Sequence, residues 1–236
     1  MEYELLSNGM RIVQSNGAFR LSTDSILLAD FCTPLRADNI IDLGCGGMSL
    51  GVLLCAYNEN YRVTGVEIQS AACEIAEENI RINGLEDRLR VVCADLREFA
   101  ADNPPKFDAV VSNPPYFPVQ SGAASPDQAQ AIAKTELYCS FDELCLAASR
   151  LLTIGGSFFL VHRPERLAEL CSILRAHRLE PKRLRFVRNT QDAPVSLVLI
   201  EARLGAGVGL TVENDLVLSR SDGTPTEEYR RIYHMP

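Results

Sequence analysis

The stretch Asn39–Gly47 reads NIIDLGCGG, an apolar run that ends near the acidic Asp42 and is followed by a turn rich in glycine. The run predicts a short buried strand, and the segment Ser49–Tyr57 behind the turn has the apolar content of a helix. Gly44 and Gly46 allow the backbone to turn sharply and to approach a ligand without a side chain in the way. This unit predicts the opening of a ligand-binding α/β domain.

The same kind of strand ending recurs along the chain outward from this stretch. The next three predicted strands end at or just before a polar residue, namely Glu67, Asp95 and Asn113. Strands and helices alternate up to about residue 180, which predicts a parallel sheet with right-handed crossovers and helices on both faces. Ligands bind such sheets at the carboxyl ends of the strands, so we expect these three residues and Asp42 to share that edge. The predicted strands cover residues 39–43, 61–67, 89–93, 107–112, 157–161, 184–187 and 195–202, and the predicted helices cover residues 25–31, 49–57, 70–83, 141–152, 166–177 and 226–233.

Three local signals complete this outline. Thr23 or Asp24 is the predicted N-cap of the helix over residues 25–31. The pair Gly155-Gly156 predicts a turn, and Phe117–Lys134 reads as a long loop of the kind that usually carries function.

The composition is that of a soluble globular protein. The 236 residues are 47% hydrophobic with a formal net charge of −8, and the longest apolar runs are too short to span a bilayer. We expect one domain over residues 1–236, with an N-terminal segment to residue 38, a ligand-binding core over 39–203 and a C-terminal extension over 204–236. The start shows no signal peptide, so we expect a cytoplasmic protein. The oligomeric state is open at this point, with a monomer favoured.

The eight cysteines are scattered without any CxxC pair, and the chain has three histidines. Zinc sites need ligands in tight pairs, so we expect no metal site. The cysteines are expected to be free thiols that pack as small hydrophobic side chains.

Positive charge is concentrated near the end of an otherwise acidic chain. Residues 175–188 contain six lysines and arginines, opposed within the run by Glu180 alone. A solvated helix face and loop would explain the run. A patch that contacts phosphates is the other interpretation, with Lys182, Arg183 and Arg185 as its candidate RNA-binding residues.

The acidic strand ends indicate what kind of ligand could bind. Glu67 could accept hydrogen bonds from both hydroxyls of a ribose, as in dehydrogenases, so this signal alone is weak. Asp42 precedes the glycines, where it would repel a pyrophosphate but could hold an ammonium group. The third glycine of a GxGxxG motif would fall at Ser49. A ligand with an amino-acid end and an adenosine end therefore fits better than a dinucleotide, with Asp95 accepting from the adenine amino group.

The fourth predicted strand runs into Asn113-Pro114-Pro115-Tyr116. The Asn113 side-chain oxygen and the Pro114 carbonyl can both accept hydrogen bonds from an NH2 group. Such bonds draw the nitrogen lone pair out of conjugation and aim it at an electrophilic methyl group. Tyr116 can stack on a planar target, and no general base is needed before the attack.

With these motifs the sequence resembles the class I S-adenosylmethionine-dependent methyltransferases of the NPPY amino-methylating group, over about residues 20–202. The resemblance implies a Rossmann-like α/β fold with a seven-stranded, mostly parallel sheet whose last strand, Val195–Ala202, is antiparallel. The first motif of that group is usually Asp-x-Gly-x-Gly-x-Gly, which Asp42, Gly44 and Gly46 match. The sequence departs from it at Gly47-Met48, so the contacts around Met48 are open at this point. The implied cofactor is S-adenosylmethionine, with S-adenosylhomocysteine as product. The implied catalytic residues are Asn113, Pro114, Pro115 and Tyr116, and the implied cofactor-binding residues are Thr23, Asp42, Gly44, Gly46, Glu67, Ile68, Asp95, Leu96 and Asn113.

Two further segments narrow the resemblance. Residues 19–28, FRLSTDSILL, look like the Thr-Asp-x-x-Leu-Leu segment of the bacterial tRNA1(Val) adenine-37 N6-methyltransferase family. The residues after Tyr116, with Ser125-Pro126 and Lys134-Thr135-Glu136, are similar to the loop that follows the motif in that family. The resemblance places Thr23 beside the amino-acid end of the cofactor and implies tRNA as the substrate.

Other functions remain open at this point. An NPPY enzyme could act on ribosomal RNA, DNA or a protein glutamine, although DNA enzymes usually have a recognition domain and release-factor enzymes an N-terminal helical domain. The alternatives from another class are an NAD-dependent oxidoreductase and a catalytically silent nucleotide-binding module.

Overall fold

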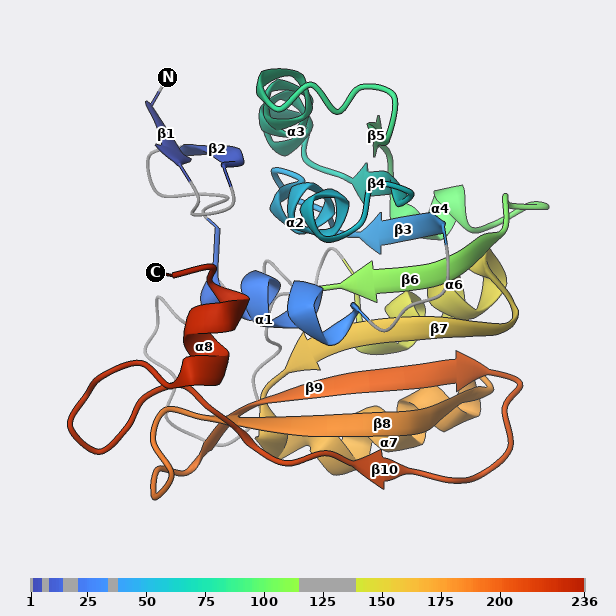
Figure 1. Ribbon diagram of the computed structural model, residues 1–236. Coiled ribbons are helices and arrows are strands. Elements are labelled where there is room, and N and C mark those ends of the chain that lie inside the picture. Colours follow the sequence, from blue (N-terminus) through green and yellow to red (C-terminus); the bar gives the residue numbers. More distant parts are fainter. Residues whose placement is uncertain (1, 6–8, 15–20, 34–37, 115–138, 236) are drawn as a thin grey trace, which may run out of the picture.

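A nine-stranded sheet forms the centre of the protein in the computed structural model, which describes residues 2–5, 9–14, 21–33, 38–114 and 139–235 (Figure 1). The strands follow the order β10-β8-β9-β7-β6-β3-β4-β5, and β11 also pairs with β8. They are β3 (Asn39–Leu43), β4 (Arg62–Glu67), β5 (Leu89–Cys93), β6 (Phe107–Ser112), β7 (Leu152–His162), β8 (Leu179–Arg188), β9 (Val195–Leu204), β10 (Thr211–Val212) and β11 (Leu216–Val217).

The strand directions confirm the predicted sheet. The five strands from β5 to β7 are mutually parallel. β9 is antiparallel to both of its neighbours, β7 and β8, as expected for Val195–Ala202. All seven predicted strands are present, and the sheet gains β10 and β11, two-residue strands that the polar end of the sequence did not indicate.

Helices cover both faces of this sheet, as the strand–helix alternation predicts. Neighbouring residues of one strand serve opposite faces: Ile40 belongs to the core cluster with the first helices, and Ile41 to the cluster with α6 and α7. An antiparallel hairpin of β1 (Glu2–Leu5) and β2 (Arg11–Gln14) precedes the sheet. The helices are α1 (Thr23–Phe31), α2 (Ser49–Tyr57), α3 (Ser70–Ile82), α4 (Leu96–Phe99), α6 (Phe141–Leu151), the 3-10 helix η1 (Pro164–Arg166), α7 (Leu167–Ala176) and α8 (Glu227–Ile232).

The last helix packs against the first, as Figure 1 shows for α8 in red and α1 in blue. Arg231 forms a bidentate ion pair with the buried Asp30, at 2.8 and 3.1 Å. The hydroxyls of Tyr233 and Thr23 are hydrogen-bonded at 2.9 Å. These contacts fix α1, which leads into the functional site, to the C-terminal segment.

Two local predictions were wrong. The N-cap of α1 is Ser22 rather than Thr23 or Asp24, because Ser22 has extended backbone angles and its hydroxyl accepts from the amide of Ser25. Gly155-Gly156 does not form a turn before the strand over residues 157–161 but lies inside β7, where the register with β6 shifts. Gly155 has a φ of +83°, and a Cβ on Gly156 would lie 2.8 Å from the Asp108 carbonyl, so the glycines form a bulge.

All eight cysteines lie in the described residues and are free thiols, five of them buried. Within the described ranges, no group of three His, Cys, Asp or Glu side chains is placed to hold a metal ion. Of the helices in the described part of the chain, none is long and apolar enough to cross a membrane.

Candidate cofactor-binding and active site

The polar strand ends meet at one edge of the sheet, as predicted. Asp42 is paired in register with Gly65 of β4 and with Val111 of β6. Glu67 is the last residue of β4, and Asn113 directly follows β6. Since these strands are parallel, their carboxyl ends lie side by side. A pocket of about 130 Å³ opens there, lined by residues 44–47, by Asp42, Ser49 and Leu50, and by Ser22, Ser25 and Asn113.

The glycine loop, residues 44–47, forms one wall of this pocket. Gly44 and Gly46 have φ values of +74° and +52°, in the left-handed region that favours glycine. The loop lies directly on β4, because a Cβ on Gly65 would be 2.5 Å from the Cys45 sulfur. The amide of Gly46 donates to Glu67 Oε2 at 3.0 Å, so the carboxylate helps to fix the loop.

Met48, where the sequence departs from the usual motif, belongs to the core rather than to the pocket. Its side chain is fully buried, and its sulfur lies 2.8 Å from the position of a Cβ on Gly65. Its φ is +65°, so the backbone takes the conformation that a glycine would adopt without strain. The substitution therefore changes packing beneath the loop.

Asp42 presents a buried carboxylate to the pocket. It is 1% exposed, and its Oδ2 has no hydrogen-bond partner among the residues that the structure describes. Burial, and secondarily the Glu67 carboxylate, raises the pKa of Asp42 to about 8. An unpaired buried carboxylate oxygen is costly, and a cationic ligand would remove that cost. The residues present thus fit a ligand with an ammonium group.

Glu67 is also buried, and both of its oxygens already hold backbone amides. Oε2 accepts from Gly46 and Oε1 from Gln69, at 3.0 and 2.9 Å. These bonds orient the carboxylate, and each oxygen keeps a second lone pair for a ribose hydroxyl. The next residue, Ile68, is 41% exposed at the same strand end and offers an apolar surface to a planar ring.

Asp95 has local partners that the sequence did not show. Its side chain caps α4 by accepting from the Arg97 amide at 2.8 Å, and it also pairs with the Arg97 guanidinium. The hydrogen bond from Arg97 lowers the pKa of Asp95, so the group is an ionised acceptor. An adenine amino group that bound here would share the Asp95 carboxylate with Arg97. Leu96 packs partly buried against the core.

Asn113 contacts two serines that sequence reasoning missed. Its Nδ2 donates to Ser25 Oγ at 3.0 Å and to Ser22 Oγ at 3.3 Å. Ser22 and Ser25 line the pocket, whereas the hydroxyl of Thr23 is bonded to Tyr233. Both serines lie beside the predicted N-cap of α1, and this position was the feature of the sequence that could have indicated them. Pro114 is buried; Pro115, Tyr116 and the predicted loop over residues 117–134 lie outside the described residues.

The basic run near the end of the chain has acidic partners in space. Lys182, Arg183 and Arg185 lie within β8, which begins at Leu179, five residues before the predicted strand over residues 184–187. Arg183 pairs with Glu201 at 2.9 Å and Glu213 at 3.0 Å.

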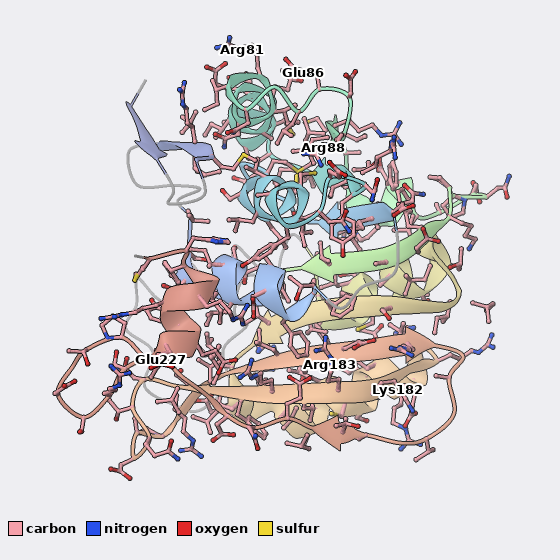
Figure 2. All side chains as sticks on the ribbon, in the orientation of Figure 1. Arg81, Glu86, Arg88, Lys182, Arg183 and Glu227 are labelled. Carbon is pink, nitrogen blue, oxygen red and sulfur yellow. The ribbon has the colours of Figure 1, made fainter. Side chains whose placement is uncertain are left out.

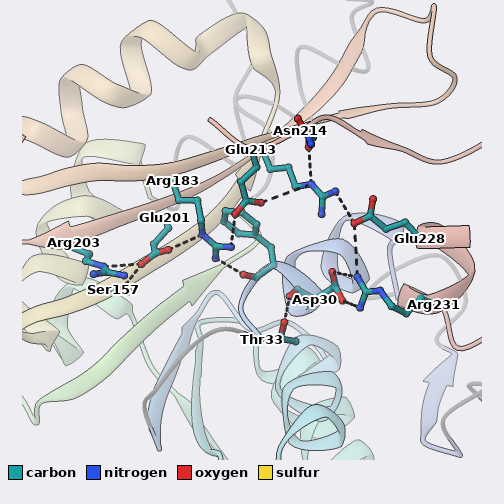
Figure 3. A network of polar contacts seen from close by, with 12 residues as sticks. Asp30, Thr33, Ser157, Arg183, Glu201, Arg203, Glu213, Asn214, Glu228 and Arg231 are labelled. Atoms are coloured by element: carbon teal, nitrogen blue, oxygen red, sulfur yellow. Dashed lines mark hydrogen bonds and ion pairs between the residues drawn. The ribbon is translucent and has the colours of Figure 1, made fainter. Parts of the chain in front are cut away.

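Arg183 also donates to the Phe31 carbonyl and lies over the ring of that residue. Arg185 pairs with Glu228 at 2.7 Å, and Lys182 donates to the carbonyl of Gly207. Figure 3 shows the ion pairs of Arg183 as part of one network that runs from Ser157 to Asp30. In Figure 2, Lys182 and Arg183 lie on β8, well away from Arg81, Glu86 and Arg88 near α3. Glu180 is the only acidic residue within the run, but tertiary contacts bring Glu201, Glu213 and Glu228 to it from outside.

The chain is similar to known methyltransferases in sequence and in fold. Residues 10–177, more than half of the chain, match the family model described as methyltransferase small domain. The tRNA1(Val) (adenine(37)-N6)-methyltransferase of Yersinia pestis (strain Pestoides F) is 27% identical over 216 residues, which are 91% of this chain and 86% of that protein.

Among solved structures, a predicted O-methyltransferase of Agrobacterium tumefaciens superposes with a TM-score of 0.71 at 22% identity, over 90% of this chain and 96% of that one. The geranyl diphosphate C-methyltransferase of Streptomyces coelicolor A3(2), in complex with S-adenosyl-L-homocysteine, gives a TM-score of 0.54 at 16% identity, over 75% and 78% of the two chains. These likenesses favour the methyltransferase over the NAD-dependent alternative. The chain therefore belongs to the methyltransferase small domain family and is an S-adenosylmethionine-dependent methyltransferase.

Proposed function

We propose that this enzyme methylates an exocyclic amino group of a nucleobase in RNA, with adenine N6 at position 37 of tRNA1(Val) as the target. The observation that carries the proposal is the Asn113 amide, held at the pocket edge with its nitrogen bound to two serines. The Yersinia relatives whose names state this reaction support the choice of target.

In this proposal the strand ends bind the cofactor. Asp42 accepts from its ammonium group, which supplies the missing partner of Oδ2. Glu67 accepts from the ribose hydroxyls, Ile68 and Leu96 contact the adenine ring, and Asp95 accepts from its amino group. S-adenosylmethionine supplies an electrophilic methyl group on a sulfonium, so the chain itself needs no nucleophile.

Asn113 then acts on the target amine. Because Nδ2 donates to Ser22 and Ser25, the amide presents Oδ1 as its acceptor. Oδ1 and the Pro114 carbonyl each accept a hydrogen bond from one N–H group of the target amine, which localises the nitrogen lone pair and directs it at the methyl group. Pro115 fixes the backbone, and Tyr116 stacks on the extruded base.

The substrate class is tested by offering labelled S-adenosylmethionine together with bacterial tRNA, ribosomal RNA, DNA or protein. Label is expected in tRNA, and a tRNA1(Val) transcript with adenine 37 changed to guanine should take up none. The Asn113→Ala enzyme is the control for contaminating activities. Label in ribosomal RNA, DNA or protein but not in tRNA would overturn the proposed target and leave the chemistry at Asn113 in place.

A further inference from the structure

Asn79 is a fully buried side chain on α3 that contacts two separate parts of the protein. It is 0% exposed. Its Nδ2 donates to the carbonyl of Gly47 in the glycine loop at 2.7 Å. Its Oδ1 accepts from the amide of Val13 in β2, also at 2.7 Å. One amide therefore joins the N-terminal hairpin to the wall of the cofactor pocket.

The Gly47 bond completes the set of contacts that fix the loop. The amide of Gly44 donates to the carbonyl of Val66, and the amide of Gly46 donates to Glu67, so the start and middle of the loop are held by β4. Asn79 holds its end from α3. Glycines have little intrinsic conformational preference, so the shape of this wall depends on such bonds.

We propose that Asn79 is a positioning residue for the cofactor: it holds Gly47 in place and thereby couples docking of the N-terminal hairpin to the shape of the cofactor pocket. The polarity of the amide matters, because one end must donate to a carbonyl and the other must accept from an amide. Asparagine meets both demands. An ionised aspartate or an alanine has no donor for the Gly47 carbonyl, and the side chain of serine is shorter than that of asparagine.

Asn83 provides a matched control one turn further along. Its Oδ1 accepts from the Arg11 amide, and its Nδ2 donates to the Arg11 carbonyl, both at 2.8 Å. Asn83, the C-cap of α3, thus binds the same hairpin, and its Nδ2 also donates to the Asn79 backbone carbonyl at 2.7 Å. Within the described part of the chain, its side chain makes no hydrogen bond to the glycine loop. Comparing the two asparagines separates a role at the loop from a general role in docking the hairpin.

Calorimetry with S-adenosylhomocysteine on Asn79→Asp and Asn83→Asp tests the proposal. One lost hydrogen bond of ordinary strength corresponds to a change of about 3- to 10-fold, so Asn79→Asp should raise the Kd by that factor, and Asn83→Asp by less than about 2-fold. In turnover assays, Asn79→Asp should raise KM for S-adenosylmethionine and leave kcat nearly unchanged. An unchanged Kd in folded Asn79→Asp, or equal losses in both variants, would overturn the proposal.

Hydrogen exchange gives a readout that does not depend on activity. Without ligand, the backbone amides of residues 44–48 should exchange faster in Asn79→Asp than in Asn83→Asp. If Asn79→Asp does not fold, Asn79→Ser takes its place in this comparison. In the wild-type protein, saturating S-adenosylhomocysteine should slow exchange of the Val13 amide along with that of the loop, because Asn79 links them. If ligand does not change the exchange rate of the Val13 amide in the wild-type protein, the proposed coupling between the hairpin and the cofactor pocket is wrong.

Discussion

Asn113 and Ser25 are joined by a hydrogen bond of 3.0 Å between residues 88 positions apart in the chain. The bond connects the end of β6 to the first turn of α1, so the residue proposed to act on the substrate is oriented by a helix that precedes the sheet. Ser22 adds a second bond to the same nitrogen at 3.3 Å. The orientation of the Asn113 amide therefore depends both on the end of β6 and on the start of α1.

Ser25→Ala should lower the single-turnover rate by about 2- to 10-fold, because one of the two bonds that orient Asn113 is lost. Asn113→Ala should lower it by about 100- to 1,000-fold, since the acceptor itself is gone. Affinity for S-adenosylhomocysteine should change less than the rate in both variants. Ser149→Ala, on α6 with a hydroxyl bonded to the Leu146 carbonyl, is the control. A Ser25→Ala enzyme with full rate would show that Asn113 is oriented by other contacts.

Asp42 should make stability depend on pH. Its pKa is raised from 3.8 to about 8 in the folded protein, so between these values the folded state binds more protons than the unfolded state. Stability of the ligand-free enzyme should therefore fall as pH rises from about 4 to about 8, with a slope of at most about 1.4 kcal/mol per pH unit from this group. Denaturant unfolding at several pH values measures the slope, and Asp42→Asn should flatten it.

The Asp42 carboxyl group should also release a proton when the cofactor binds at pH 7, because an ammonium group beside it favours the ionised form. Calorimetry of S-adenosylhomocysteine binding at pH 7, in two buffers of different ionisation enthalpy, detects this release. Equal heats in both buffers would mean that Asp42 does not meet the ammonium group.

Arg183→Ala should destabilise the fold by about 3 kcal/mol, because the buried Glu201 and the Phe31 carbonyl lose a charged partner. Arg175→Ala, in the same basic run but with an exposed side chain paired to Glu180, should cost less than about 1 kcal/mol. Urea unfolding of the two variants gives the comparison.

If Lys182, Arg183 or Arg185 instead contacts RNA, its removal flattens the dependence of log affinity for tRNA on log salt by about 0.7 to 0.9 per contact. A stable Arg183→Ala protein with that smaller salt slope would assign the run to RNA docking.

Met48→Gly should destabilise the protein in spite of relieving a left-handed conformation. The relief amounts to about 1–2 kcal/mol. Removing a buried methionine side chain costs about 2–5 kcal/mol, because it leaves a cavity between the loop and Gly65. Thermal unfolding of Met48→Gly and of the volume-conserving Met48→Leu measures the balance. A more stable Met48→Gly would show that strain outweighs packing here.

The residues at the carboxyl ends of the parallel strands were predictable from the sequence, because the end of a strand is marked by the residues next to it. Asp42, Glu67 and Asn113 each follow an apolar run, and parallel pairing alone brings such residues together. The contacts of those side chains were not predictable in this way. Ser25 reaches Asn113, and Glu201 reaches Arg183, through tertiary packing that no local pattern records.

The Asp30–Arg231 pair has a consequence for how the enzyme comes into being. The two residues are separated by 201 positions, so α1 is synthesised well before its partner in α8. Contacts of such long range form late, because the chain entropy of closing the loop must be paid first. Docking of α8 fixes the position of α1, which has Ser22 as its N-cap and Ser25 in its first turn. Synthesis of the segment up to residue 231 thus sets the earliest moment at which a nascent chain acquires an ordered Asn113.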